Sequence, residues 1–280
     1  MLFDETHLMR LSQGQLNTLE KCPRQFQHTY LEQLYSPVDP DHDEKLMLGS
    51  RFHLLMQQRA MGLSIDSFLE TDAQLRGWID GLSTVAPFIL EKTSDETFKE
   101  SEHYRTLQFQ DYLLTVVYDL LIADNVQAQI FDWKTYPKPQ NQKYLEQNWQ
   151  TKLYLFVLAE TSQYVPENIS MTYWFVQPHD KPQSIKFNYS TAQHEQTKNK
   201  LNQLLTQLNR YITAYYKGQD FPQVPEGSKI CDNCQFAARC NRNNLPLSNS
   251  QQTLALALDP SLLDLVTIEE VPLKVESAEC

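Results

Sequence analysis

The sequence has no apolar run that approaches the roughly 20 residues needed to cross a membrane as a helix. Its first residues, MLFDETHLMR, contain two acidic residues and no apolar core, so they do not read as a secretory signal. The chain also has no internal repeat. These absences argue against a membrane protein and a secreted protein, and they predict a cytoplasmic protein with no membrane partner.

Positive charge is scarce in this chain. It has 24 Lys and Arg residues against 35 Asp and Glu residues, which gives a formal net charge of −11. This balance argues against a protein that binds nucleic acid through bulk charge alone. It leaves room for a local basic groove.

Cysteines are few and odd in number, but three of the five lie close together. The stretch CDNCQFAARC holds Cys231, Cys234 and Cys240, whereas Cys280 is the last residue. In a reducing compartment, closely spaced thiols bind metal more often than they form disulfides. The three neighbouring cysteines therefore predict a metal site.

Hydrophobic periodicity predicts helical and strand-rich parts in a chain long enough for one large domain or two small ones. Helices are expected over 11–34 with a break at Pro23, 43–62, 66–92, 141–161 and 191–217. Strands are expected over 103–109, 112–123, 126–135, 169–177 and 184–189, and a loop over 36–42. Short polar breaks between the first three strands indicate an antiparallel meander. This order predicts an α/β core with helical additions at both ends.

The stretch QIFDWKTYP, residues 129–137, places an acid and an amine inside an expected strand. Asp132 and Lys134 are two residues apart, so their side chains point to the same face. Asp119 ends the strand before and should meet Asp132 across the hairpin. Two carboxylates so close repel each other unless a cation lies between them, and oxygen ligands suit Mg²⁺ or Mn²⁺. Lys134 could then orient the attacking water or neutralise a phosphate, although a D-x-K pair alone is often a surface salt bridge.

Two further features lie near this pair in the expected fold. His53 follows a glycine on a helix in GSRFH, and Gln150 and Tyr154 are four residues apart on one face of the helix that follows the D-x-K strand. Each feature alone is compatible with a structural role. Together with the D-x-K strand they predict one site.

The order of these residues resembles the RecB-like branch of the PD-(D/E)xK nucleases, which includes CRISPR-associated exonucleases and the nuclease domains of RecB and AddB. The stretches LSQGQLNTLEKCPRQFQHTYL and FPQVPEGSKICDNCQFAARC are similar to the N-terminal segment and the cysteine cluster of those proteins, so the likeness covers about residues 11–241. It implies a restriction-endonuclease-like core, with a mixed sheet and flanking helices, in a single domain over 1–241. An acidic, partly ordered tail over 242–280 would follow.

The resemblance also implies roles for individual residues. The metal ligands would be His53, Asp119, Asp132 and the backbone carbonyl of Trp133. Lys134 would act on the water or the phosphate, and Gln150 and Tyr154 would position the DNA strand or Lys134. Glu102 is similar to an acidic position often found before the first strand of these proteins. The chain departs from the family pattern at Val116, where glycine is common, and it lacks Walker A and helicase motifs, so it resembles the nuclease module alone.

A closed cysteine site needs a fourth ligand, and Cys22 in KCPRQF is the candidate. It precedes Cys231 by 231 − 22 = 209 residues, so a shared site would join the first helices to the last segment. The resemblance implies a [4Fe–4S] cluster on Cys22, Cys231, Cys234 and Cys240. Spacing alone also allows Zn²⁺, or a Cys22 that is only a small buried apolar residue.

Lysines and aromatic residues alternate around the helix after the D-x-K strand. Lys138, Lys143 and Lys152 are interleaved with Tyr144 and other aromatic residues, a composition that suits single-stranded nucleic acid. An ordinary solvent-exposed helix face would have the same composition.

These features predict a metal-dependent DNase that acts on single-stranded ends, in DNA repair, recombination or CRISPR-related processing, with a helicase or a repair or CRISPR protein as partner. A DNA-binding or scaffold subunit with a vestigial site is the alternative. An enzyme acting on RNA or a nucleotide is the third hypothesis.

Overall fold

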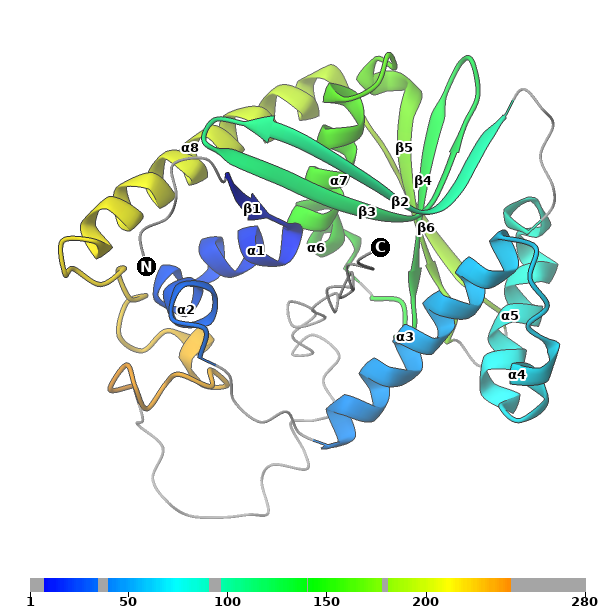
Figure 1. Cartoon of the computed structure of the whole chain (residues 1–280), viewed down its shortest axis with the longest axis horizontal. Coiled ribbons are helices and arrows are strands. Elements are labelled where there is room, and N and C mark those ends of the chain that lie inside the picture. Colours follow the sequence, from blue (N-terminus) through cyan, green and yellow to red (C-terminus); the bar gives the residue numbers. More distant parts are fainter. Residues whose placement is uncertain (1–7, 35–39, 91–96, 140, 178–180, 243–280) are drawn as a thin grey trace, which may run out of the picture.

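A computed structural model of the chain describes residues 8–34, 40–90, 97–139, 141–177 and 181–242, apart from the side chains of 40–43. It shows a mixed sheet with helices packed on both faces (Figure 1). Most of the expected loop over 36–42, nearly all of the acidic tail and Cys280 lie outside the described residues. Within the described part, no helix has both the length and the apolar character needed to cross a bilayer.

The sheet has six strands, and its central meander is confirmed. The strands are β1 (Met9–Leu11), β2 (Phe98–Phe109), β3 (Tyr112–Ala123), β4 (Ala128–Lys134), β5 (Ile169–Phe175) and β6 (Gln183–Asn188). The order is β1-β3-β4-β5-β6, with β2 paired to the other edge of β3. β2, β3 and β4 are antiparallel in sequence, β4 and β5 are parallel, and β5 and β6 are antiparallel. The sequence does not predict β1, which runs parallel to β3 and is only three residues long.

The helices occupy the expected regions but differ in their bounds, and the expected helix over 66–92 is divided into three shorter helices. They are α1 (Gln13–Lys21), α2 (Pro23–Phe26), η1 (Gln27–Leu31), α3 (Pro40–Ala60), α4 (Asp66–Glu70), α5 (Ala73–Val85), η2 (Pro87–Ile89), α6 (Gln142–Gln147), α7 (Trp149–Glu160), η3 (Pro166–Asn168), α8 (Thr191–Tyr215) and η4 (Lys229–Cys231). α3 begins at Pro40, inside the expected loop, because proline suits the first turn of a helix. The expected helix over 141–161 is divided at Asn148, whose side chain caps α7.

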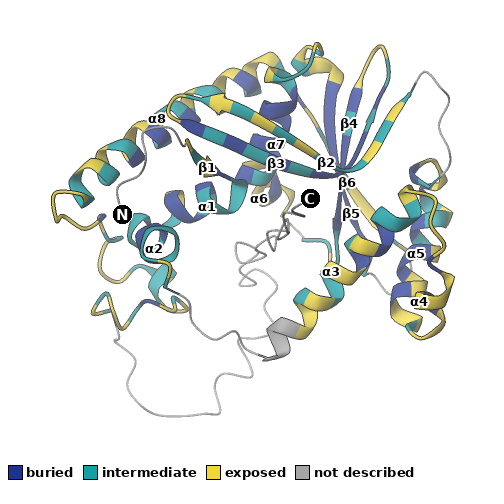
Figure 2. Ribbon diagram, viewed as in Figure 1, coloured by how far each residue is buried: buried dark blue, intermediate teal, exposed yellow. Residues whose placement is uncertain are grey.

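Apolar side chains of the strands alternate between two cores, one on each face of the sheet. Ile130 points to the core that contains α1, α7 and α8, whereas Phe131 points to the core formed with α3, α4 and α5. α7 is buried on nearly all sides because it lies between the sheet and α8. Figure 2 shows that the strands are largely buried, whereas the outer surfaces of α3 and α4 are exposed. The alternation fixes the face on which each polar strand residue emerges.

One edge of β3 pairs with two different strands along its length. On the edge away from β2, residues 112–114 pair with β1 and residues 120–123 pair with β4. No strand in the described part of the chain pairs with this edge over 115–119. The last β3–β4 pair is Leu120 with Phe131, so Asp119 and Asp132 are the next positions in register, at the point where the two strands separate. This change of partner therefore places two acids beside an unpaired stretch of backbone.

Candidate active site and cysteine pocket

His53 reaches the sheet from α3. Its neighbours Phe52, Leu55 and Met56 are buried in the core on that side and hold the helix against the strands. A Cβ atom on Gly49, one turn earlier, would lie 3.1 Å from the hydroxyl oxygen of Thr135, so glycine allows the close approach of α3 to the end of β4. This packing brings His53 Nδ1 to 3.2 Å from Asp119 Oδ1.

Glu102 completes a possible set of three metal ligands with His53 and Asp119. One ligand atom from each residue lies within 4.8 Å of the other two. Glu102 has φ +53°, which places a residue with a Cβ atom in the left-handed region in the middle of a strand. Such backbone costs about 1–2 kcal/mol and is enriched at functional sites. The strain supports a functional interpretation of Glu102.

Asp119 also closes a gap in the backbone ladder. Its Oδ2 accepts a hydrogen bond from the backbone N–H of Trp133 at 2.6 Å, and its Oδ1 faces His53. β3 offers no backbone partner to this N–H group, because pairing with β4 ends at Leu120. The carboxylate therefore has a fixed orientation. The Trp133 side chain is buried in the core that α3 forms with the sheet, and the ligand role of its carbonyl stays a prediction.

Asp132, Lys134 and Gln150 form a second group beside the first. Lys134 Nζ lies 2.7 Å from Asp132 Oδ1 and donates to Gln150 Oε1 at 2.9 Å. Gln150 Nε2 donates to Asp132 Oδ2 at 2.7 Å, so one amide group holds both residues of the D-x-K pair. Lys134 Nζ also lies over the ring of Tyr173, 5.2 Å from its centroid. Asp132 is buried and only 13% of the Lys134 side chain is exposed, unlike a surface salt bridge.

Burial and the attraction between opposite charges dominate the electrostatics of the site. Burial raises the pKa of Asp132 to about 7, and the nearby Asp119 adds to the rise although Lys134 opposes it. Burial lowers the pKa of His53, but the charge and the hydrogen bond of Asp119 outweigh it and bring the pKa to about 9. Burial also opposes the charged form of Lys134, yet Asp132 raises its pKa above the usual value. The carboxylates of the site thus lie beside two cationic groups, Lys134 and His53, and His53 must lose its proton before it can bind a metal ion.

The donor set fits a divalent metal ion. Glu102 and Asp119 supply hard oxygen ligands, and His53 supplies an imidazole nitrogen. Asp132 Oδ1 is buried and accepts no hydrogen bond of normal geometry from the described residues, although the Lys134 ammonium lies beside it. A metal ion bound beside Asp132 would share this oxygen atom with the Lys134 ammonium, 2.7 Å away.

The remaining predicted residues lie at different distances from this group. Tyr154 is fully buried, with its ring against that of Tyr118. Lys138 is half-buried and Lys143 and Tyr144 are exposed, all in the segment that follows β4. Lys152 points to another face of α7, where its ammonium lies 5.9 Å from the ring centroid of Trp149. Of these residues, the ones after β4 stay candidates for contact with nucleic acid.

Four cysteines from the two ends of the described chain line one small pocket. Cys22 is buried where α1 meets α2, and Cys231, Cys234 and Cys240 are half-buried in the last described segment. None of the four forms a disulfide. Burial raises the pKa of the Cys234 and Cys240 thiols, and the neighbouring cysteines contribute to the rise. We refer to these four residues and the space between them as the cysteine pocket.

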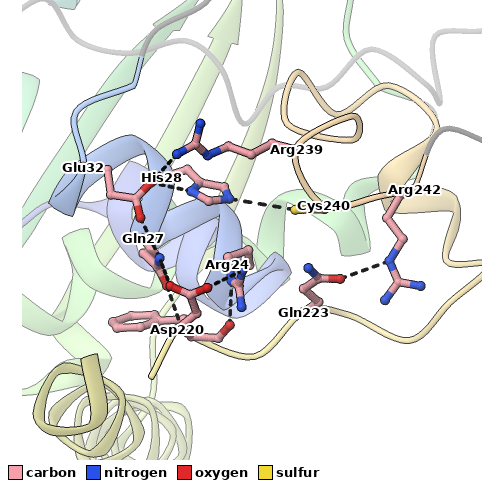
Figure 3. A network of polar contacts seen from close by, with 10 residues as sticks. Arg24, Gln27, His28, Glu32, Asp220, Gln223, Arg239, Cys240 and Arg242 are labelled. Carbon is pink, nitrogen blue, oxygen red and sulfur yellow. Dashed lines mark hydrogen bonds and ion pairs between the residues drawn. The ribbon is translucent and has the colours of Figure 1, made fainter. Parts of the chain in front are cut away.

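Polar contacts tie the two sides of the cysteine pocket together (Figure 3). Arg24 Nε donates to the carbonyl of Phe221 at 2.7 Å, and Gln27 Oε1 accepts the backbone N–H of Phe221 at 2.6 Å. His28 lies between Glu32, 2.7 Å from its Nδ1, and the Sγ atom of Cys240, 3.9 Å from its Nε2. The first helices and the last described segment are thus held together next to the four thiols.

The sulfur atoms are spaced widely. Among the described residues, His53, Glu102 and Asp119 form the one set of three His, Cys, Asp or Glu ligand atoms within 4.8 Å of one another. No three of the four cysteine sulfurs are therefore that close together. Sulfurs bound to one zinc ion at about 2.3 Å would lie about 3.8 Å apart. The cysteine pocket is wider than a preformed site for a single zinc ion.

Two asparagines that the sequence interpretation missed support the candidate active site at Gln150. Asn148 caps α7, and Asn17 of α1 contacts that cap. An N-cap residue directly before Trp149 is a readable signal, because asparagine is a preferred cap. The contact with Asn17 has no signal in a single sequence, since 131 residues separate the two asparagines.

A mixed sheet that carries a cluster of carboxylates and an imidazole beside a D-x-K lysine defines the class of metal-dependent nucleases with a PD-(D/E)xK motif. The model of the PD-(D/E)XK nuclease superfamily matches residues 10–241, so the chain belongs to this superfamily and is a nuclease domain. Members of the superfamily use divalent metal ions and cleave nucleic acids.

Comparison with solved structures agrees on the fold. A crystal structure from Eubacterium rectale, described as "Putative exonuclease", is 12% identical, with 92% of this chain and 96% of that chain covered and a TM-score of 0.53. The structure of SSO0001 is 11% identical, with 85% of this chain and 89% of that chain covered and a TM-score of 0.39. No curated protein sequence matches the chain.

Proposed function

We propose that this chain is a metal-dependent deoxyribonuclease of the RecB-like branch, which hydrolyses phosphodiester bonds at single-stranded DNA ends. One observation carries the proposal: His53, Glu102 and Asp119 present ligand atoms within 4.8 Å of one another, beside the buried Asp132–Lys134 pair. A structural salt bridge needs only one acid for its lysine. The additional acids and the imidazole make sense if the site binds a cation.

The chemistry follows from the donors and their charges. Mg²⁺ or Mn²⁺, held by His53, Glu102, Asp119 and Asp132, would supply a Lewis acid and lower the pKa of bound water. The Lys134 ammonium would neutralise negative charge on the phosphate oxygens, because it stays protonated at neutral pH. Gln150 keeps Lys134 and Asp132 in a fixed relative position, which lowers the cost of reaching the reactive geometry.

Substrate contact would begin at the segment after β4. Lys138, Lys143 and Tyr144 directly follow the site in the chain and combine positive charge with an exposed aromatic ring. That combination suits single-stranded DNA, which stacks on aromatic side chains without sequence preference. The neighbour described as "Putative exonuclease" supports action at DNA ends. The net charge of −11 makes a helper that delivers single strands, such as a helicase or a repair or CRISPR protein, a fitting partner.

Cleavage of labelled DNA tests the proposal. End-labelled single-stranded and double-stranded DNA are incubated with the protein and Mg²⁺ or Mn²⁺, and with EDTA as a blank. Asp132→Ala and Lys134→Ala should each reduce the rate by at least about a hundredfold. The exposed residues Asp80 and Lys186 provide matched controls, and Asp80→Ala and Lys186→Ala should cut like the wild type.

The outcomes separate the alternative hypotheses. Wild-type rates from Asp132→Ala would refute the site, and DNA binding without any metal-dependent cleavage would favour the scaffold hypothesis. Faster cleavage of a matched RNA competitor would move the substrate class from DNA to RNA. Equal rates on circular and linear single strands would exclude a requirement for ends.

The cysteine pocket is proposed to hold a [4Fe–4S] cluster on Cys22, Cys231, Cys234 and Cys240. The convergence of four free thiols and their wide sulfur spacing support an iron–sulfur cluster over a single Zn²⁺. The cluster would close residues 1–241 into a single domain, with residues 242–280 as a tail outside it. Protein purified without oxygen should be brown and contain iron and sulfide. Colourless protein with one zinc per chain would overturn this assignment.

A further inference from the structure

The first turn of α7 is the support on which Gln150 depends. Asn148 is the N-cap of this helix, and its Oδ1 accepts the backbone N–H of Gln150 at 2.8 Å. The same oxygen atom accepts a hydrogen bond from Asn17 Nδ2 at 3.1 Å. Asn17 belongs to α1, so a residue from a distant part of the chain holds the cap in place.

Asn17 makes a second contact with the same turn. Its Oδ1 accepts the backbone N–H of Trp149 at 3.2 Å, a group that has no partner within its own helix at this position. One amide side chain therefore donates to the cap and accepts from the first helical residue. Both contacts are across helices, between α1 and α7. They fix the position of the turn as well as its hydrogen bonds.

The position of Asn17 in α1 points to this tertiary role. Asparagine is a poor residue for the interior of a helix, because its side chain competes for backbone groups. The buried neighbours Leu16 and Leu19 anchor α1 in the core, and Asn17 is half-buried between the two helices. The anchored helix gives Asn17 a rigid base.

The geometry at Gln150 makes the site sensitive to small shifts of this turn. Its Nε2 faces Asp132 at 2.7 Å and its Oε1 faces Lys134 at 2.9 Å, so a rotation of the amide breaks both contacts at once. Hydrogen bonds of this kind span about 2.7–3.2 Å and weaken steeply when they bend below about 120°, and a misplacement of about 1 Å costs up to a hundredfold in rate.

We propose that Asn17 is a positioning residue of the active site: through Asn148 and the first turn of α7, it sets the place of Gln150 and thereby the geometry of Asp132 and Lys134. The proposal rests on the proposed nuclease function. It differs from a packing role, because it requires the effect of Asn17 to pass through the Gln150 side chain.

The test compares Asn17→Ala with Ser190→Ala in the full chain. Ser190 caps α8, so its loss also removes one helix cap, but it touches none of the site residues. We expect Asn17→Ala to lower kcat about tenfold with KM for DNA within about twofold, and Ser190→Ala to change neither. If Asn17→Ala folds poorly, Asn17→Asp replaces it. The aspartate can still accept from Trp149 but cannot donate to Asn148, so a similar loss of kcat is expected.

A double mutant separates positioning from general destabilisation. If Asn17 acts through Gln150, then Asn17→Ala in the Gln150→Ala background should lower kcat by no more than about twofold. If the loss of kcat in the double mutant equals the product of the two single-mutant losses, the proposal is overturned. A kcat for Asn17→Ala that matches Ser190→Ala would overturn it as well.

The affinity for Mn²⁺, measured by calorimetry, gives a readout that needs no turnover. Asn17→Ala should weaken Mn²⁺ binding about threefold or more through the loosened Asp132, and Ser190→Ala should leave it unchanged. Unchanged Mn²⁺ affinity in Asn17→Ala would overturn the proposal even in an inactive preparation. Full cleavage by Asp132→Ala would instead refute the nuclease site itself, so the two failures are distinguishable.

Discussion

Asp119 accepts the backbone N–H of Trp133 at 2.6 Å, where β3 and β4 stop pairing. A carboxylate thus takes the place of a main-chain carbonyl in the ladder. The same contact turns its other oxygen towards His53, 3.2 Å away. A backbone requirement of the sheet and a ligand position of the site are therefore met by one side chain.

Two substitutions of Asp119 should separate these roles. Asp119→Asn and Asp119→Ala both remove the charge, and both should abolish metal-dependent cleavage. Asparagine can still accept the Trp133 N–H, whereas alanine leaves it unsatisfied in a buried position, which costs about 1–3 kcal/mol. Urea unfolding should therefore show Asp119→Ala to be the less stable variant by that amount. Equal stability of the two would show that water or backbone shifts satisfy the N–H group.

Glu102 should show a trade between stability and function. Glu102→Gly and Glu102→Gln both remove the negative charge, but only glycine also relieves the strain of φ +53°, so we expect the glycine variant to be more stable by about 1 kcal/mol. Both variants should bind Mn²⁺ more weakly than the wild type. Thermal unfolding and calorimetry measure the two effects. A glycine variant less stable than the glutamine variant would mean that the backbone at this position is not strained.

Metal affinity should rise with pH because His53 must lose a proton to bind a cation. Burial lowers the pKa of His53 but Asp119 raises it to about 9, so the imidazole is charged at neutral pH. In the metal-free protein its ion pair stabilises fully below about pH 6.5, the ordinary value, and this stabilisation is lost as the pH rises through about 9. Each pH unit below about 9 should therefore cost up to tenfold in apparent Mn²⁺ affinity.

His53→Gln provides the control for this pH dependence, because glutamine carries no titrating proton. Its Mn²⁺ affinity should be lower at pH 8.5 and should change less between pH 6.5 and 8.5 than that of the wild type. Calorimetry at three pH values measures the Mn²⁺ affinity of both proteins and so compares their pH dependence. An identical slope in both proteins would assign the released proton to another group, such as Asp132, whose pKa burial raises to about 7.

Replacement of Cys22 should test the link between the two ends of the chain. Cys22→Ser should lose most of the iron and sulfide and melt several degrees lower, because cluster binding is coupled to folding. Cys280→Ser, the matched control, should keep the wild-type iron content. Iron analysis, visible absorption and thermal unfolding supply the measurements. Full iron content in Cys22→Ser would remove this residue from the ligand set.

Local patterns in the sequence were sufficient to predict much of the fold and part of the site. Alternation across residues 126–135 places Asp132 and Lys134 on one face, and hairpin spacing puts Asp119 beside Asp132, as the structure shows. The helices could be read from their apolar periodicity. These features depend on neighbours within a few residues or on one short turn.

Other features depend on contacts that no local pattern carries. β1 has three residues and forms only because β3 offers it an edge, and the contact between Asn17 and Asn148 joins two helices 131 residues apart. The positive φ of Glu102 is imposed by the surrounding strands, since glutamate itself disfavours it. Tertiary structure decides such positions, and the local preference of the residue is overruled.

The change of partner along β3 has a consequence for how this enzyme can diversify. The acids of the site stand on the central ladder, where the surrounding strands fix their positions, and not on a connecting loop. The segment after β4, with its exposed Lys143 and Tyr144, lies outside this ladder and can vary in composition without disturbing them. Substitutions outside the ladder can therefore change substrate preference while the acids of the site keep their positions.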